Sequence, residues 1–493
     1  MKTIQETVVK KERPIKVLQF GEGNFLRAFV DWIIDQLNEK STFNGDVLMV
    51  QPLLNGMGNM INDQNGLYTT VLRGVQQGKP VEEFRKITSV RGCLNPYTEH
   101  EKYIAQAKNP DLRFIISNTT EAGIAYHEGD KLEDKPQTSF PGKVCAFLYE
   151  RYKAFDGAAD KGIIFIPCEL IDKNGDNLKR IVLQYAHEWN LPEEFIAWVE
   201  NACDFCNSLV DRIVPGYPRA EADELCARLG YKDNLLDAAE IFLLWVIECH
   251  GKTHQDELPT DKAGVNVIWT DDMSFYRTRK VRILNGAHTM TVLAAYLAGL
   301  NTVEECIKSD LVFPMMKRGL FEEIIPSMDG DKKQLEEYAH DVLERFANPY
   351  IVHLVLSISL NSVSKFKTRD LPSLVGYIEK KHEIPSVLTF SLASLIAFYN
   401  GKLNADKTAL VGNRNGEEYL IKDSPEVLAF FDKLYSDSYN CNNCKAKAIA
   451  HAVLSNTDWW GQDLTLLEGL EEKVAGYLRT IYNDGMVEAI KAL

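Results

Sequence analysis

The stretch Ile15-Lys16-Val17-Leu18-Gln19-Phe20-Gly21-Glu22-Gly23-Asn24-Phe25-Leu26-Arg27-Ala28 decides the fold. Its first six residues predict a short strand, and an amphipathic helix follows the two glycines. A strand, a glycine turn and a helix are typical of the loop that holds a dinucleotide. Gly21 permits the tight turn, and Gly23 lets the backbone approach a pyrophosphate. Leu26 replaces the third glycine and Glu22 adds a negative charge, so this loop alone does not establish a nucleotide site.

Three later apolar runs have the character of buried parallel strands, at residues 47–50, 112–116 and 163–166. Each ends in polar residues, and ligands of open α/β sheets lie beyond the carboxyl ends of the strands. We therefore expect cofactor contacts from Gln51, which could bond a ribose hydroxyl, and from Asn118, Thr119 and Thr120. Turn formation and helix capping remain the alternative for the last three.

The two halves of the chain differ in their patterns. Strand signals nearly vanish after residue 280, and helical patterns dominate at 302–319, 333–346, 350–365, 386–399, 425–435, 445–454 and 464–482. The stretch from Asn400 to Glu418 is expected to form an exposed loop or hairpin. The sequence thus predicts an α/β protein, with a Rossmann-like doubly wound sheet in residues 1–275 and a mainly α-helical domain in residues 276–493.

A second stretch, Lys280-Val281-Arg282-Ile283-Leu284-Asn285-Gly286-Ala287-His288, carries the candidate chemistry. On an α-helix that advances about 100° per residue, Asn285 lies roughly 140° from Lys280, with His288 between them. A lysine kept partly neutral by burial can move a proton, an asparagine can hold an oxyanion, and a histidine can orient the oxygen. These groups suit alcohol oxidation or ketone reduction without a metal, although all three residues are also ordinary on a surface helix. Gly286 inside this apolar pattern suggests the close approach of another group.

Basic residues near this stretch offer sites for an anion. Arg277 lies three residues before Lys280 on the same helix face, where it would either lower the pKa of the lysine or bind a substrate carboxylate. The cluster Lys365-Phe366-Lys367-Thr368-Arg369 follows an apolar helix. It is either a solvated helix end, favoured by the helix dipole, or a second carboxylate site in which arginine binds in bidentate fashion.

Composition limits the class of protein. The chain has 493 residues, of which 45% are hydrophobic and 25% charged, which is ordinary for a soluble protein of two domains. A net charge of -15 argues against a nucleic-acid partner and requires local cations for any acidic substrate. We see neither a signal peptide nor an apolar run long enough to span a membrane, so a cytoplasmic location and a small-molecule substrate are expected.

The ten cysteines point to a reducing compartment. Most, such as Cys145, Cys168 and Cys249, lie in apolar surroundings and are expected to be buried reduced thiols. Two pairs have the C-x-x-C spacing, Cys203/Cys206 in a helical pattern spanning 195–210 and Cys441/Cys444 in an asparagine-rich stretch. Zinc or redox roles for these pairs are the alternative reading; no metal is expected in the reaction itself.

Together these residues resemble the polyol-specific long-chain dehydrogenases, typified by mannitol dehydrogenase. Lys280-x4-Asn285-x2-His288 is similar to the active-site motif of that family, and Gly21-x-Gly23-x-Phe25-x-Arg27-Ala28 is similar to its nucleotide loop. The match runs over nearly the whole chain. Within the family, the segments most similar to the hexuronate-reducing members are residues 19–31, 117–124, 167–172, 209–214 and 279–289.

The resemblance implies a metal-independent, NAD-dependent reduction of a hexuronate ketone. Lys280 would be the general acid or base, Asn285 would stabilise the oxyanion, and His288 would orient the substrate. It also implies cofactor contacts at Phe20, Gly21, Gly23, Asn24, Phe25, Arg27 and Ala28, and substrate contacts at Val210, Asp211 and Lys365, with Arg277 as a further candidate.

Three positions depart from the family pattern. Leu170 stands where the polyol enzymes carry a second oxyanion asparagine, Arg277 where they carry an acid, and Ser357 where they carry an arginine. The change to Arg277 is in the direction that an anionic substrate favours. A fructuronate reductase or polyol dehydrogenase of the same fold, and a nucleotide-binding regulatory protein without turnover, are the alternatives.

Overall fold

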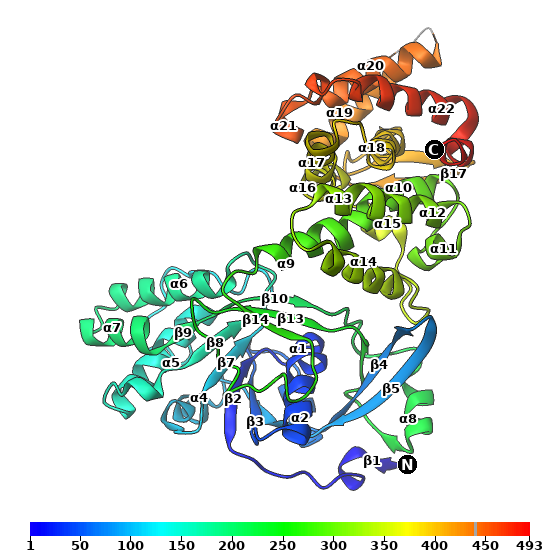
Figure 1. Ribbon diagram of the computed structural model, residues 1–493. Coiled ribbons are helices and arrows are strands. Elements are labelled where there is room, and N and C mark those ends of the chain that lie inside the picture. The colour runs from blue at the N-terminus through cyan, green and yellow to red at the C-terminus, as the bar shows by residue number, and fades with distance from the viewer. Residues whose placement is uncertain (438–440) are drawn as a thin grey trace. The chain divides into compact units, whose positions relative to one another are not determined.

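The computed structural model describes residues 1–437 and 441–493, and the chain divides into two compact units (Figure 1). The N-terminal unit comprises Met1–Gly74 and Val81–Ser274, and the C-terminal unit comprises Val75–Pro80 and Phe275–Leu493. The first contains a parallel sheet and the second is mainly helical, so the expected fold class is confirmed. Within the described residues, no helix is both long and apolar enough to cross a membrane.

A six-stranded parallel sheet forms the centre of the N-terminal unit. Its spatial order is β6-β3-β2-β7-β8-β9, so the chain winds outward in both directions from β2. The carboxyl end of β2 therefore lies at the point where the strand order reverses, which is the ligand site of doubly wound sheets. The strand bounds are β2 (Ile15–Phe20), β3 (Asp46–Val50), β6 (Val90–Leu94), β7 (Phe114–Ser117), β8 (Ile164–Pro167) and β9 (Asp204–Phe205).

Both faces of this sheet are covered, which explains its uninterrupted apolar runs. One face packs against four helices, α4 (His100–Ala105), α5 (Phe140–Ala154), α6 (Asn174–Glu188) and α7 (Glu193–Ala202). The other face packs against α2 (Val30–Lys40) and a second sheet of β10 (Asn207–Asp211), β13 (Leu244–Glu248) and β14 (Val267–Thr270). The consecutive side chains of Val17 and Leu18 in β2 are consequently both fully buried.

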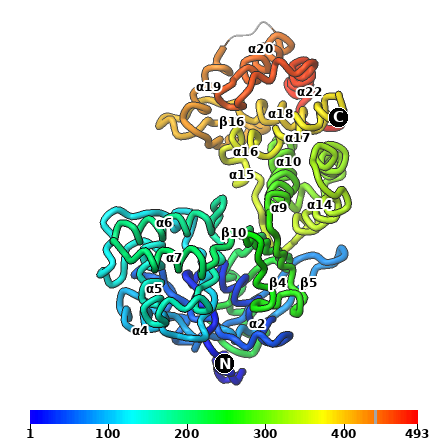
Figure 2. The backbone as a smooth tube through the Cα atoms, turned by 60° about the vertical axis from the view of Figure 1, so that its left-hand side comes forward, coloured from blue at the N-terminus to red at the C-terminus, as the bar shows by residue number. Residues whose placement is uncertain are grey.

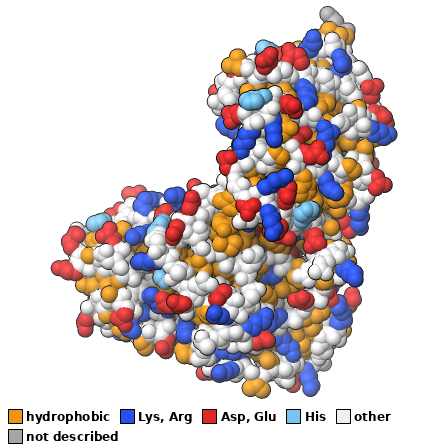
Figure 3. Space-filling view, viewed as in Figure 1, with side chains coloured by type: hydrophobic (Ala, Val, Ile, Leu, Met, Phe, Trp, Pro, Cys, Tyr) orange, Lys and Arg blue, Asp and Glu red, His pale blue; other side chains and the backbone are white. Residues whose placement is uncertain are grey.

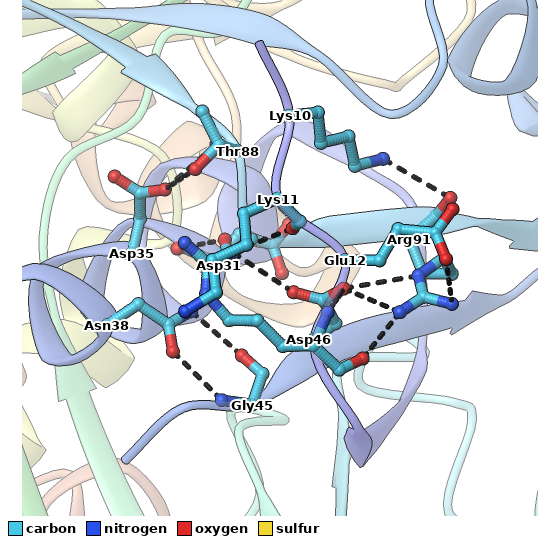
Figure 4. Close-up of polar contacts among 12 residues, drawn as sticks. Lys10, Lys11, Glu12, Asp31, Asp35, Asn38, Gly45, Asp46, Thr88 and Arg91 are labelled. Carbon is cyan, nitrogen blue, oxygen red and sulfur yellow. Dashed lines mark hydrogen bonds and ion pairs between the residues drawn. The ribbon is translucent and has the colours of Figure 1, made fainter. Parts of the chain in front are cut away.

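The amino edge of the parallel sheet is fixed by buried ion pairs (Figure 4). Asp46, the first residue of β3, is fully buried. Its carboxylate accepts hydrogen bonds from Arg13 N at 3.0 Å and from Arg91 Nη2 at 3.0 Å. On α2, Asp35 Oδ1 accepts from Thr88 N at 2.8 Å. These contacts join the chain before β2 to β3 and β6, and they leave the opposite, carboxyl edge for ligands.

A long hairpin was not expected from the sequence. It consists of β4 (Tyr68–Gln76) and β5 (Lys79–Ile87), and β12 (Asp237–Glu240) pairs with β4. Gln77 and Gly78 both have positive φ, 51° and 72°, as the two-residue turn of a hairpin requires. The tip of this hairpin belongs to the C-terminal unit, where Gly78 N donates to Glu344 Oε1 at 3.3 Å.

In the C-terminal unit, α18 (Ser386–Phe398) packs against α10 (Gly286–Leu297) and α22 (Leu470–Lys491) (Figure 2). Every residue of α18 from Val387 onward is buried. The stretch expected as a loop or hairpin is a three-stranded antiparallel sheet of β15 (Gly401–Leu403), β16 (Leu410–Arg414) and β17 (Glu417–Ile421). The other helices include α11 (Val303–Lys308), α12 (Val312–Arg318), α14 (Lys332–Phe346), α17 (Leu371–Lys381), α19 (Pro425–Ser436) and α20 (Asn442–Leu454).

Three sequence expectations were wrong. The helix expected at 350–365 is two helices, α15 (Val355–Ile358) and α16 (Ser362–Arg369), because Asn361 adopts a left-handed conformation with φ 54°. The helical pattern at 195–210 ends at Ala202, where the chain turns into β9 and β10. Cys249, expected as a reduced thiol, forms a disulfide with Cys206. The bond lies next to the paired residues Asn207 of β10 and Glu248 of β13.

Candidate active site

The glycine turn has the space that a dinucleotide requires. Gly21 follows β2 with φ 121°, and a Cβ there would lie 2.8 Å from the carbonyl oxygen of Asn118. Gly23 precedes α1 (Asn24–Ala28), and a Cβ there would have no atom within 4 Å. Only glycine fits at position 21, because of its positive φ and the nearby carbonyl oxygen of Asn118. At Gly23 the absence of a side chain leaves an open space. This combination fits a pyrophosphate held against bare backbone.

The two glycines should therefore respond differently to the same substitution. We expect Gly21→Ala to lower the melting temperature, because its Cβ is strained and crowded, and also to weaken NADH binding. Gly23→Ala should leave the melting temperature unchanged and weaken NADH binding at least about tenfold, because the methyl group occupies the space of the phosphates. Differential scanning fluorimetry and NADH fluorescence titration measure both. Unchanged NADH affinity in Gly23→Ala would show that the pyrophosphate does not bind at this turn.

Several loop side chains predicted to bind the cofactor are packed inside. Phe20, Arg27 and Ala28 are fully buried, and Phe25 stacks on Phe29. Arg27 Nη1 donates to Leu235 O at 2.8 Å, and Nη2 donates to Asn24 Oδ1 at 2.6 Å. Arg27 thus joins Asn24, the first residue of α1, to the segment of Leu235, and its side chain fixes the shape of this loop.

Of the other predicted cofactor residues, Gln51 and Asn118 form hydrogen bonds within the protein, whereas Thr120 is exposed. Gln51 Nε2 donates to the carbonyl oxygens of Leu53 and Leu54 at 2.7 and 2.8 Å, so it closes the loop after β3. A ribose contact from its amide would replace these bonds. Asn118 Nδ2 donates to Cys168 O at 3.2 Å. Thr120 is exposed and has φ 75°, an uncommon conformation that often marks a functional loop.

Glu169 was missed by the sequence analysis and organises this loop. Its side chain is buried at the end of β8, and burial raises the pKa of its carboxyl group. Oε1 accepts from Thr119 N and Thr119 Oγ1, both at 2.9 Å, and Oε2 accepts from Ser117 Oγ at 3.0 Å. An acidic residue directly after an apolar strand was the available signal. Thr119 is therefore occupied in positioning the loop.

The stretch from Lys280 is not the regular α-helix that we expected. Residues Lys280–Asn285 form the π-helix η4 between α9 (Ser274–Arg279) and α10. Gly286 N donates to Val281 O, five residues earlier. In this pitch, residues five apart lie on successive turns of one face, so Lys280 and Asn285 are closer in direction than the 140° of an α-helix. Both side chains are half-buried, whereas His288 is buried in the first turn of α10.

The close approach expected at Gly286 is confirmed. A Cβ there would lie 2.9 Å from Asp370 Oδ1 and 3.7 Å from Ile324 Cδ1. Ile324 ends a second π-helix, η5 (Gly319–Ile324), which packs against η4. The buried carboxyl group of Asp370 has a pKa well above its usual value, mainly because of burial. This shift favours the neutral acid beside Gly286.

His288 lies among aromatic and cationic side chains. Its ring stacks on Phe346, the last residue of α14, at 4.1 Å between centroids, and it meets His353 edge-on at 5.1 Å. Burial, followed by His353, Arg369, Arg345 and Lys365, lowers its pKa well below the ordinary value. The imidazole is therefore neutral at neutral pH. Within the described part of the chain, Nε2 has no hydrogen-bond partner.

The remaining predicted substrate residues are divided between the units. Val210 and Asp211 are buried in β10 of the N-terminal unit, opposite Trp245 and Leu244 of β13. Arg277 on α9 and Lys365 on α16 are half-buried in the C-terminal unit. The glycine turn and the loops after β3 and β7 belong to the N-terminal unit, and the Lys280 motif belongs to the C-terminal unit.

Comparison with known proteins identifies the class. Residues 15–260 match the family model for the mannitol dehydrogenase Rossmann domain, and residues 272–482 match the model for the mannitol dehydrogenase C-terminal domain. The chain therefore belongs to the mannitol dehydrogenase family. It is an oxidoreductase that acts on a CH–OH group, and its Rossmann domain is the fold that binds NAD.

The curated relatives of this chain include altronate oxidoreductases. Those of Cronobacter sakazakii and Escherichia coli are each 46% identical over 481 residues, 97% of this chain and 97% of the relative. The resemblance inferred from the motifs is confirmed.

Two solved structures share the fold over nearly their whole length. D-sorbitol dehydrogenase in substrate-free form has a TM-score of 0.79 and 22% identity, covering 99% of this chain and 100% of that one. The Pseudomonas fluorescens mannitol 2-dehydrogenase complex with NAD and D-mannitol has a TM-score of 0.68 and 20% identity, covering 100% of this chain and 99% of that one.

Proposed function

We propose that this protein catalyses the reversible, NADH-dependent reduction of D-tagaturonate to D-altronate in hexuronate catabolism. The similarity to altronate oxidoreductases supports a sugar-acid substrate. The structural observation that carries the proposal is the neutral, buried His288 beside η4, which is surrounded by Arg345, Lys365 and Arg369. Such a positive environment favours an anionic sugar over a neutral one.

The residues of η4 supply the proton chemistry. The Gly21–Gly23 turn and the loop of Thr120 would hold NAD, which would supply the hydride in reduction and accept it in oxidation. As the ketone oxygen gains negative charge, the Lys280 ammonium donates a proton to it, and the Asn285 amide donates a hydrogen bond to the same oxygen. His288 orients that oxygen through its neutral ring. A lysine and an asparagine meet the needs of this transfer without a metal.

A substrate panel tests the proposal. We expect NADH oxidation to be fastest with tagaturonate, slower with fructuronate and slowest with fructose, with activity retained after treatment with a chelator. NADPH should be the poorer reductant. Fastest turnover on fructuronate would assign the protein to that uronate, and fastest turnover on fructose would remove the sugar-acid assignment. NADH binding without any substrate-dependent oxidation would indicate a regulatory protein.

Over the face of the molecule in Figure 3, acidic and basic side chains are mixed. No continuous basic surface of the kind that binds nucleic acid is visible on that face. This mixture of charges is consistent with the small sugar acid proposed above.

A further inference from the structure

Polar side chains of α10 and α16 meet close to His288. His288 and Thr289 are consecutive buried residues in the first turn of α10. Arg369, the last residue of α16, donates from Nη1 to Thr289 Oγ1 at 3.1 Å. The guanidinium is therefore tethered one residue from the catalytic histidine, and a planar fork tethered at one nitrogen keeps further donors for a ligand.

Two cationic side chains of α16, Arg369 and Lys365, interact with each other electrostatically. Among the residues that the structure describes, neither Arg369 nor Lys365, one helical turn earlier, forms an ion pair. Asp370 follows Arg369 directly, and burial raises the pKa of its carboxyl group well above the usual value, which favours the neutral form. Lys365 Nζ donates to the carbonyl oxygen of Ile358 at 2.7 Å, and burial and Arg369 lower its pKa. Arg369 and Lys365 are half-buried cations that repel each other, and an anion bound beside them would offset this repulsion.

The surroundings also limit what that anion can be. Phe346 and His353 flank the ring of His288, and His288 Nε2 is buried and lacks a partner in the described chain. This unpartnered nitrogen is a hydrogen-bonding position for a ligand that also reaches the cations. A single ligand that carries both a hydroxyl or carbonyl oxygen and a carboxylate, as a sugar acid does, satisfies both requirements.

We propose that Arg369, assisted by Lys365, binds the carboxylate of the substrate and sets the preference for a sugar acid over the corresponding neutral sugar. The inference rests on the proposed function and identifies its specificity residue. It assigns to Arg369 the role that the sequence analysis left open between Arg277 and the basic cluster. The carboxylate lies at the guanidinium fork, and the rest of the sugar extends toward His288 and η4.

The test compares tagaturonate with D-tagatose, its neutral counterpart. We expect Arg369→Gln to lower the ratio of kcat/KM for tagaturonate to kcat/KM for tagatose about 100-fold, because a charge-assisted bidentate contact is lost. Arg369→Lys should recover part of this ratio, since the charge remains while the fork is lost. Arg479→Gln, an exposed arginine on α22 of the same unit, is the matched control and should leave the ratio unchanged. Equal losses on both sugars, or an unchanged ratio in Arg369→Gln, would overturn the proposal.

A binding measurement separates this inference from the proposed reaction. Altronate should raise the melting temperature of the wild type and of Arg479→Gln, but not that of Arg369→Gln, with no turnover required. If the wild type fails to oxidise NADH with tagaturonate yet shows this difference, the proposed function fails and the anion site stands. If altronate stabilises Arg369→Gln as strongly as the wild type, the anion site fails whatever the turnover.

Discussion

Replacing Lys280 by alanine is expected to lower kcat for tagaturonate reduction about 10³-fold, with little change in the dissociation constants of NADH and substrate. The reason is that neither of the other two motif residues can replace its proton. Asn285 has no titratable group. The imidazole of His288 is neutral at neutral pH, because burial lowers its pKa well below the ordinary value, so it is not an imidazolium acid. Single-turnover NADH oxidation measures the effect directly, because it isolates the chemical step from product release.

The same variant offers a second readout. Added methylamine should restore part of the rate of Lys280→Ala, because a small amine can enter the space left by the side chain and supply the proton. Lys433→Ala, an exposed lysine on α19, is the control and should show neither loss nor rescue. A turnover of Lys280→Ala close to that of the wild type would refute the lysine mechanism, whichever substrate is used.

The geometry of the Lys280–Asn285 turn could not be predicted from the sequence. Periodicity arguments assume 3.6 residues per turn, and they place Asn285 well away from Lys280. The structure inserts a π-helix at this point, which is recognised only from the bond between Gly286 N and Val281 O. The residue types were sufficient to find the motif, but the backbone that brings them together depends on tertiary packing against η5, which periodicity does not report.

The parallel sheet was more predictable. Apolar runs bounded by polar residues located β2, β3, β7 and β8 closely, because strands buried on both faces carry few polar residues. Pairings between distant segments were not visible. The disulfide joins Cys206 to Cys249, 43 positions away, and not to Cys203, with which Cys206 has the C-x-x-C spacing.

The surroundings of the candidate site residues could not be predicted from the sequence. The sequence suggested Lys365 and Arg369 as a basic cluster, but only the contact with Thr289 singles out Arg369. It suggested Thr119 as a cofactor contact, whereas the side chain is bonded to Glu169. Glu169, Phe346 and His353 come from separate segments that no local pattern brings together, so their parts in the two candidate sites could not be inferred before the fold was known.

The second large effect concerns stability and involves Glu323 in η5. Its buried carboxylate accepts three backbone hydrogen bonds at the start of α18, from Ser386 N and Val387 N at 2.8 Å and from Leu388 N at 2.9 Å. The first turn of a helix has no intrahelical partners for these N–H groups, and the N-cap residue Pro385 offers no side-chain hydrogen bond. Glu323 therefore caps the most deeply buried helix of the C-terminal unit from a neighbouring segment.

We expect Glu323→Ala to lower the free energy of unfolding of the C-terminal unit by about 4 kcal/mol, because three N–H groups at a buried helix start lose their acceptor. Glu323→Gln, which keeps one acceptor oxygen, should lose roughly half as much. Glu322→Ala is the matched control, since Glu322 is the preceding residue and its side chain is 70% exposed; it should change stability by less than about 0.5 kcal/mol. Urea titration followed by circular dichroism measures all three. Equal unfolding midpoints for Glu322→Ala and Glu323→Ala would show that water can replace the cap, and that α18 does not depend on η5, the segment that also packs against η4.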